Sequence, residues 1–217
     1  LGLTSRDVLS RPCPEGESVV MTSESLSCAF MSRADLDHCT DPVDILFVEH
    51  ARQRAKLDRI IRAIEDQNID IATVASVMRP LAVDAPLHRA DEEDSLFPLL
   101  FQRKRREDNM EPLIRQLLDE HHALEGAATM VMVQLANCRQ EGGILLPMAL
   151  RADLLKLVFL AEAHLALENG IMLPIAHQRL TLGDRLTIGR DFRSRRTRFR
   201  EFTGPHLVHN GASHMRH

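Results

Sequence analysis

Apolar residues recur every three or four positions over long parts of this chain, with charged residues between them. The first such segment runs from Thr40 or Asp41 to about Gln67. Its recurring positions are Leu46, His50, Leu57, Ile60 and Ile61. This period predicts an amphipathic α-helix. Thr40 or Asp41 would cap the helix, and Pro42 suits its first turn because the missing N–H is not needed there.

A second helix is expected from about Ile69 to about Arg103. Pro80 and the stretch 83–86 are expected to interrupt it, because a proline inside a helix removes a backbone hydrogen bond and clashes with the preceding turn. For the same reason a kink or an early break is expected at Pro98.

The third helix is expected over 111–140, ended by the glycine pair that follows, and the fourth over 147–176, with Pro174 inside it. One face of the third helix carries Ile114, Leu117, His121, Leu124, Ala128, Val131 and Leu135. The apolar residues are mainly Leu, Ala, Ile and Met, a mix that favours helix over sheet. We therefore predict an all-α fold.

These helices form one predicted domain, residues 41–180. Residues 1–40 are polar and rich in serine, and we interpret them as an N-terminal extension. Residues 181–217 are expected to hold a short helix capped by Thr181, then an Arg- and His-rich tail. No aromatic stacking pattern accompanies the six arginines of the stretch 190–200, which favours a solvated face over a nucleic-acid site.

Composition narrows the function classes. With 44% hydrophobic residues in 217, the chain can bury a core, and its net charge of −4 indicates no polyanion or membrane partner. The best candidate for a membrane span, Leu154–Ala166, is interrupted by Lys156 and Glu162, and no signal-peptide pattern is visible. Four cysteines lack CxxC spacing, which is typical of reduced thiols. We expect a cytoplasmic protein. The absence of tyrosine argues against tyrosyl-radical chemistry.

Two similar motifs stand out within the helices. His88 and Glu92 are four residues apart, as are His164 and Glu168, and in each case a proline follows ten residues after the histidine. Residues at i and i+4 lie on one face of a helix, so each pair points into one small volume. A Glu-His dipeptide precedes each motif, Glu49-His50 in the first half and Glu120-His121 in the second.

Four helices with inward histidines and carboxylates are typical of a two-metal site in a bundle core. One His-x-x-x-Glu pair alone would be weak support, but two copies with the same proline offset are stronger. Burying Glu92 and Glu168 without a counter-charge would cost several kcal/mol each, and divalent cations would remove that cost. The alternative is a solvent-exposed bundle edge with ordinary His–Glu hydrogen bonds.

The order of these motifs over residues 41–180 resembles that of the hemerythrin-like (HHE cation-binding) domains. The resemblance implies an up-down four-helix bundle around an oxo- or hydroxo-bridged pair of iron ions. It makes Glu92 and Glu168 the bridging carboxylates. The terminal ligands that it implies are His50, His88, His121 and His164. Imidazole and carboxylate ligands suit iron, with manganese as the alternative metal.

The roles of two positions on the third helix stay open. His121 is adjacent to His122, and the repeat of the Glu-His dipeptide favours His121 as the ligand. Glu125 follows His121 at i+4, so it is a candidate seventh ligand or else an outward or supporting carboxylate.

Oxygen-carrying hemerythrins have His-x-x-x-His on the third helix, and on the fourth a His followed five residues later by Asp. This chain has His-x-x-x-Glu in both places, which argues against reversible oxygen carriage. The pattern is closer to the bacterial iron–sulfur-cluster repair proteins and to sensor-type domains, although the Cys-Cys segment usual in the repair family is not seen.

The resemblance leads us to expect a non-haem di-iron protein that binds or senses O2, NO or peroxide in stress response or iron handling. One alternative is a di-iron enzyme for NO reduction, peroxide decomposition or iron–sulfur cluster repair. Another is a metal-independent helical bundle that binds a partner protein. The oligomeric state is left open.

Overall fold

The computed structural model describes residues 41–65, 71–140 and 146–202. The predictions for the N-terminal extension and for the tail beyond residue 202 lie outside these residues. The described residues form helices and short turns, with no strand among them. The helical segments are α2 (Pro42–Glu65), α3 (Ile71–Asp91), η2 (Glu92–Leu96), α4 (Phe97–Arg103), η3 (Arg106–Asp108), α5 (Met110–Gln140), α6 (Met148–Leu167), η4 (Glu168–Met172), α7 (Leu173–Arg179) and α8 (Leu182–Phe202).

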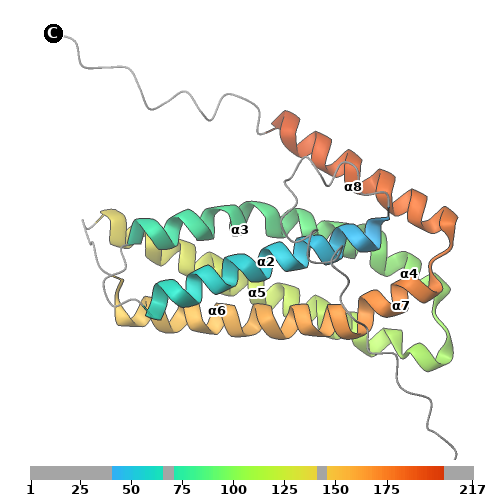
Figure 1. Ribbon diagram of the computed structural model, residues 1–217, viewed down its shortest axis with the longest axis horizontal. Helices are drawn as coiled ribbons and strands as arrows, with labels where there is room; N and C mark the ends of the chain where they lie inside the picture. The colour runs from blue at the N-terminus through green and yellow to red at the C-terminus, as the bar shows by residue number, and fades with distance from the viewer. Residues whose placement is uncertain (1–40, 66–70, 141–145, 203–217) are drawn as a thin grey trace, which may run out of the picture.

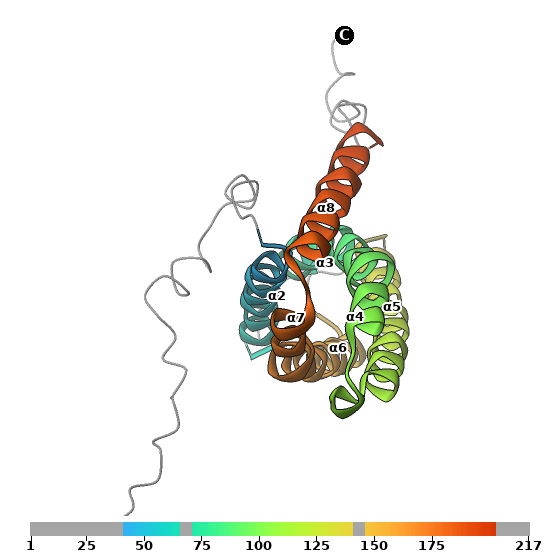
Figure 2. The same ribbon diagram turned by 90° about the vertical axis from the view of Figure 1, so that its right-hand side faces the viewer.

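Four long rods run up and down side by side (Figure 1). They are α2, the continuous run α3–η2–α4, α5, and the continuous run α6–η4–α7. Seen end-on, the rods surround a common centre, and α8 lies outside them against α2 and α3 (Figure 2). The predicted all-α bundle is confirmed.

The start of α2 follows from its first residues. Asp41 accepts a hydrogen bond from the backbone N–H of Val43 at 2.9 Å, which satisfies one of the free N–H groups of the first turn. Pro42 then occupies the first helical position. Of the two residues proposed as the cap, Asp41 therefore fills the role.

The predicted interruption of the second helix is wrong, because α3 continues through Pro80 and Pro86. A proline inside a helix costs about 3 kcal/mol. Four buried residues on the first half of α3 outweigh this, since each apolar side chain contributes roughly 1.5–3 kcal/mol on burial. They are Ile71, Val74, Val77 and Met78.

Pro98 and Pro174 cause a π-helical turn instead of a break. In η2 the N–H of Phe97 bonds to the carbonyl of Glu92, and in η4 the N–H of Leu173 bonds to that of Glu168, both five residues back. The wider turn accommodates the proline that follows, and each rod then continues as α4 or α7. Each π turn begins at the glutamate of a His-x-x-x-Glu motif.

Two apolar clusters fill the bundle. The first joins the start of α2 to α4, α7, the start of α5 and the inner face of α8. The second joins the later part of α2 to α3, α6 and the later part of α5. The histidines and glutamates singled out in the sequence lie between these clusters along the helices.

The run Met148–Arg179 is long and apolar enough, by length and composition, to cross a membrane. In the sequence the best candidate span, Leu154–Ala166, is interrupted by Lys156 and Glu162, and the longer helical run corrects the expectation drawn from that stretch. The same run carries His164 and Glu168 on the face buried in the bundle, as expected of a core helix. Its outer face is mixed: Met148 and Phe159 are largely exposed, and Lys156 and Glu162 are exposed as well.

The predicted short C-terminal helix is in fact a 21-residue helix. Thr181 caps it as expected: its hydroxyl accepts a hydrogen bond from the N–H of Asp184 at 3.2 Å, and Asp184 accepts the N–H of Thr181 at 2.9 Å. The expectation of a solvated arginine face holds for only part of the helix. Arg195 and Arg196 are half-buried, and both form ion pairs with the buried Asp91 of α3.

The core assignment is tested by two neighbouring leucines of α6. Leu154 is fully buried and Leu155 is 48% exposed. Leu154→Ala is expected to lower the free energy of unfolding by about 2–5 kcal/mol, because it leaves a cavity in the core. Leu155→Ala is expected to change it by less than about 0.5 kcal/mol. Urea unfolding of the two variants measures the difference, and equal losses would contradict the assignment.

Candidate metal centre

Six side chains converge between the two apolar clusters, and every rod of the bundle contributes. They are His50 on α2, His88 on α3, Glu92 on η2, His121 on α5, His164 on α6 and Glu168 on η4. All six residues are buried, with at most 7% of each exposed. The helical period explains the convergence, since each residue lies on the inward stripe of its own helix.

The six residues form two groups that share both glutamates. One group contains His50 and His88, and the other contains His121 and His164. Within each group one ligand atom per residue lies within 4.8 Å of all the others. The Nε2 atom of His50 lies 3.3 Å from Glu168, and the Nε2 atom of His121 lies 3.3 Å from Glu92, so each glutamate faces both groups.

The Nδ1 atom of each histidine is hydrogen-bonded on the side away from the cluster. The acceptors are Glu49 for His88 at 3.0 Å, Glu120 for His164 at 2.9 Å, Glu93 for His121 at 2.7 Å and Asn169 for His50 at 2.6 Å. An acceptor at Nδ1 fixes the tautomer in which Nδ1 carries the hydrogen and Nε2 carries the lone pair. All four Nε2 atoms can therefore offer a lone pair to the cluster.

Several polar atoms of the cluster lack a hydrogen-bond partner. Both carboxylate oxygens of Glu92, both of Glu168 and the Nε2 atom of His121 are buried without a hydrogen-bond partner. Buried polar atoms without partners are costly, and buried charges are normally paired or bound to metal.

The spacing of the donor atoms fits cations. Two donors bound at about 2.1 Å to one ion, at 90–110° to each other, lie roughly 3.0–3.4 Å apart. Nε2 of His164 lies 3.2 Å from Glu168, Nε2 of His88 lies 3.5 Å from Glu92, and the Nε2 atoms of His50 and His88 lie 3.0 Å apart. The residues present therefore suit cation binding.

The electrostatics of the metal-free cluster also favour the binding of positive charge. Burial lowers the pKa of His88, but the carboxylates of Glu92 and Glu49 outweigh it and raise the pKa to about 10. The pKa of His164 rises to about 9 in the same manner, through Glu168 and Glu120. Burial opposes ionisation of Glu92, yet the adjacent histidines hold its pKa well below the usual range. Protons on His88 and His164 thus supply positive charge where cations would otherwise supply it.

Of the seven residues predicted as candidate ligands, the structure brings six together, and Glu125 takes the outward alternative and not that of a ligand. The Glu125 side chain is 55% exposed and accepts two hydrogen bonds from Arg89, at 2.7 and 3.1 Å. Its neighbour His122 is also exposed and bonds to the backbone carbonyl of Leu118, whereas His121 faces the cluster. Glu125 turns outward because its helix presents Leu124, not Glu125, to the second apolar cluster.

Sequence reasoning gave no role to the four outer acceptors, Glu49, Glu93, Glu120 and Asn169. A signal for them was present, because each lies directly beside a predicted ligand: before His50 or His121, or after Glu92 or Glu168. Each acceptor serves a histidine on a different rod, so the partner could not be read from the sequence. Glu49 also binds Arg196 of α8 at 2.6 Å.

The fold and the cluster define a helical-bundle protein with a buried cation-binding site. The family model for the hemerythrin HHE cation-binding domain matches residues 41–176, which is more than half of the 217 residues. The chain belongs to this family. A search among curated proteins finds no match.

The outer acceptors are tested at Glu120. Glu120→Ala removes the acceptor of His164 and is expected to weaken cation affinity about 10- to 100-fold. Glu120→Gln keeps an acceptor oxygen and is expected to weaken it less. Glu111→Ala, at an exposed position of the same helix, serves as the control and is expected to have no effect. Competition with a metal chelator measures all three, and equal affinity for Glu120→Ala and the parent would rule out the role.

Cation binding is also expected to release protons. His88 and His164, with pKa values of about 10 and about 9, are protonated in the metal-free protein at pH 7, and each must lose a proton to bind a cation. Because each cation displaces one of these protons, the apparent affinity for each cation is expected to rise about tenfold per pH unit between pH 6.5 and 8.5. Chelator competition across this range measures the slope. An affinity independent of pH would show that these histidines do not bind the cation.

Proposed function

We propose that this protein is a non-haem di-iron protein that binds or senses a small ligand such as O2, NO or peroxide. One observation carries the proposal: Glu92 and Glu168 each lie close to both pairs of histidines and so belong to both groups of ligand residues. A carboxylate has two oxygens, so each glutamate can bridge two cations that are held separately by His50 with His88 and by His121 with His164.

The donor types favour iron. Imidazole nitrogen and carboxylate oxygen suit iron and manganese, whereas softer metals prefer thiolate. Cys138 is the only cysteine in the described part of the chain, and it belongs to neither group of ligands. Manganese is the alternative metal for the same donor set.

The ligand count leaves room for a further molecule. Two histidines and one oxygen from each of the two glutamates would give each ion four protein ligands, fewer than a six-coordinate iron takes. Bound iron would supply open coordination positions and a redox couple. The protein holds the ligands in place through the outer acceptors and shields the site with the apolar side chains of both clusters.

Contacts with α8 support a sensing role over simple storage. Arg196 of α8 binds Glu49, and Glu49 binds His88, so a chain of two contacts joins a surface helix to a ligand. A change in the ligands or charge near His88 would alter its hydrogen bond to Glu49. The ion pair between Glu49 and Arg196 of α8 would change as a result. A role in stress response or iron handling in the cytoplasm is consistent with such a device.

Iron content and spectrum test the proposal. After anaerobic reconstitution with ferrous iron and exposure to air, we expect about two irons per chain and an oxo-to-iron band in the near ultraviolet. His121→Ala is expected to lose the band and at least half of the iron. The matched control is His122→Ala, at the adjacent exposed position, which is expected to keep both. Less than about one iron per chain, with no band, would reject the proposal.

The spectrum also separates sensing from catalysis. A sensor is expected to show a spectral change with NO or H2O2 at one equivalent and no multiple turnovers. Sustained consumption of either ligand would instead assign the site to a di-iron enzyme.

A further inference from the structure

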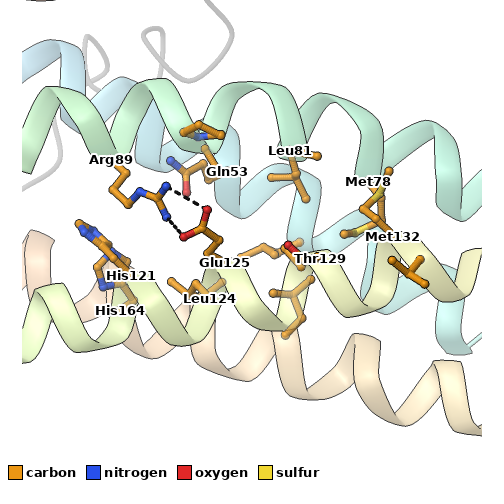
Figure 3. A pocket seen from close by; sticks show the side chains of 18 of the residues that line it. Gln53, Met78, Leu81, Arg89, His121, Leu124, Glu125, Thr129, Met132 and His164 are labelled. Carbon is orange, nitrogen blue, oxygen red and sulfur yellow. Dashed lines mark hydrogen bonds and ion pairs between the residues drawn. The ribbon is translucent and has the colours of Figure 1, made fainter.

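A cavity of about 540 Å³ lies beside the candidate metal centre. Residues of α3 and α5 line its sides and residues of α2 and α6 its floor. His121 and His164 lie at one end, and Met78 and Met132 lie toward the other (Figure 3). The cavity therefore extends along the bundle from the second pair of histidines into the second apolar cluster.

Small side chains create this space. Alanines on three of the surrounding helices face it, where larger residues would fill the gap between the rods. They are Ala82 and Ala85 on α3, Ala128 and Ala136 on α5, and Ala161 on α6. Ala82, Ala85 and Ala136 are exposed, so the cavity opens to solvent between α3 and α5.

The size of the cavity exceeds what a diatomic ligand or peroxide requires. A water molecule takes up about 30 Å³ in the liquid, and two-atom ligands are of similar size. Cavities of about 300–1,000 Å³ with apolar walls and few polar groups are typical of sites for organic molecules. The deeper walls here are apolar and include Leu57, Leu81 and Leu157.

The charges at the cavity do not favour an ionic ligand. Apart from the two histidines, the charged side chains in its lining are Arg89 and Glu125, and these pair with each other through two hydrogen bonds (Figure 3). Arg89 also lies 4.0 Å from Glu93. A carboxylate ligand would have to displace Glu125 from Arg89, whereas a neutral molecule leaves the pair intact.

We propose that this cavity binds a neutral, elongated apolar organic molecule, such as an alkane or a primary alcohol of medium chain length. One end of the molecule lies next to His121 and His164, and its chain lies among the leucines and the flexible side chains of Met78 and Met132. This goes beyond the proposed function. The binding depends on the shape and apolar lining of the cavity, so it does not need the metal.

A neutral fluorescent probe, N-phenyl-1-naphthylamine, tests the proposal on the full chain in its metal-free and iron-loaded forms. Displacement by 1-hexanol, 1-octanol and 1-decanol is expected to tighten by about fourfold for each added methylene until the cavity is full. Decanoate is expected to compete at least tenfold more weakly than 1-decanol. The reverse order, with decanoate at least tenfold tighter, would overturn the neutral class of ligand.

Filling variants test the location. Ala128→Phe and Ala161→Phe place a ring in the cavity and are expected to weaken probe binding at least tenfold. Ala123→Phe and Ala163→Phe lie on the same two helices at exposed positions outside the cavity and are expected to change it by less than twofold. Thermal unfolding verifies that each variant is folded. If both filling variants are folded and bind the probe as the parent does, the cavity is not the site.

Proximity to the metal gives a second readout. Paramagnetic ferrous iron broadens the NMR signals of nearby protons, so the signals of bound 1-octanol are expected to be broader with the chain loaded with ferrous iron and kept anaerobic than with the metal-free chain. Equal widths, with iron present at the expected content, would overturn the placement beside His121 and His164. A chain that takes up no iron but binds the alcohols with the expected sensitivity to Ala128→Phe would refute the proposed function and leave the cavity proposal standing.

Discussion

Glu92 and Glu168 place two carboxylates at the centre of the bundle, fully buried and without a hydrogen-bond donor. The free energy of such a pair is prohibitive unless positive charge is present between them. In the metal-free protein the protons of His88 and His164 supply part of that charge, and bound cations supply it more completely. The packing of the four rods is organised around this requirement, since the apolar clusters begin on either side of the charged group and both carboxylates are buried between them.

An internal repeat positions the histidines, and each half of the repeat contacts the other. The glutamate that precedes one inward histidine accepts the Nδ1 hydrogen bond of the next histidine along the chain: Glu49 does so for His88, and Glu120 for His164. The residue after each central glutamate accepts the Nδ1 hydrogen bond of a histidine of the other half, as Glu93 does for His121. Because every acceptor lies on a different rod from its histidine, the ligands cannot be positioned until all four rods have packed. Folding and formation of the site are therefore one event.

Much of this could be predicted from the sequence, for reasons that are local. Helical spacing alone decides that His88 and Glu92 share a face, and the repeated dipeptide selected His121 over His122. What the sequence left open or missed depended on distant contacts. The outward turn of Glu125 is secured by Arg89, 36 residues away in sequence, and the burial of Arg195 depends on Asp91, 104 residues away. The helix through Pro80 was missed for a similar reason, because the packing that outweighs the proline is tertiary.

The two halves of the repeat are not equivalent in their surroundings, and this difference bears on function. The pair His50–His88 lies toward α8, whose Arg196 binds the acceptor of His88. The pair His121–His164 lies at the end of the cavity that opens between α3 and α5. The acceptors differ as well, since Asn169 offers His50 a neutral oxygen where Glu93 offers His121 a charged one. A charged acceptor makes its histidine the stronger electron donor. One half of the candidate centre thus borders the cavity, and the other is connected to α8 through Glu49.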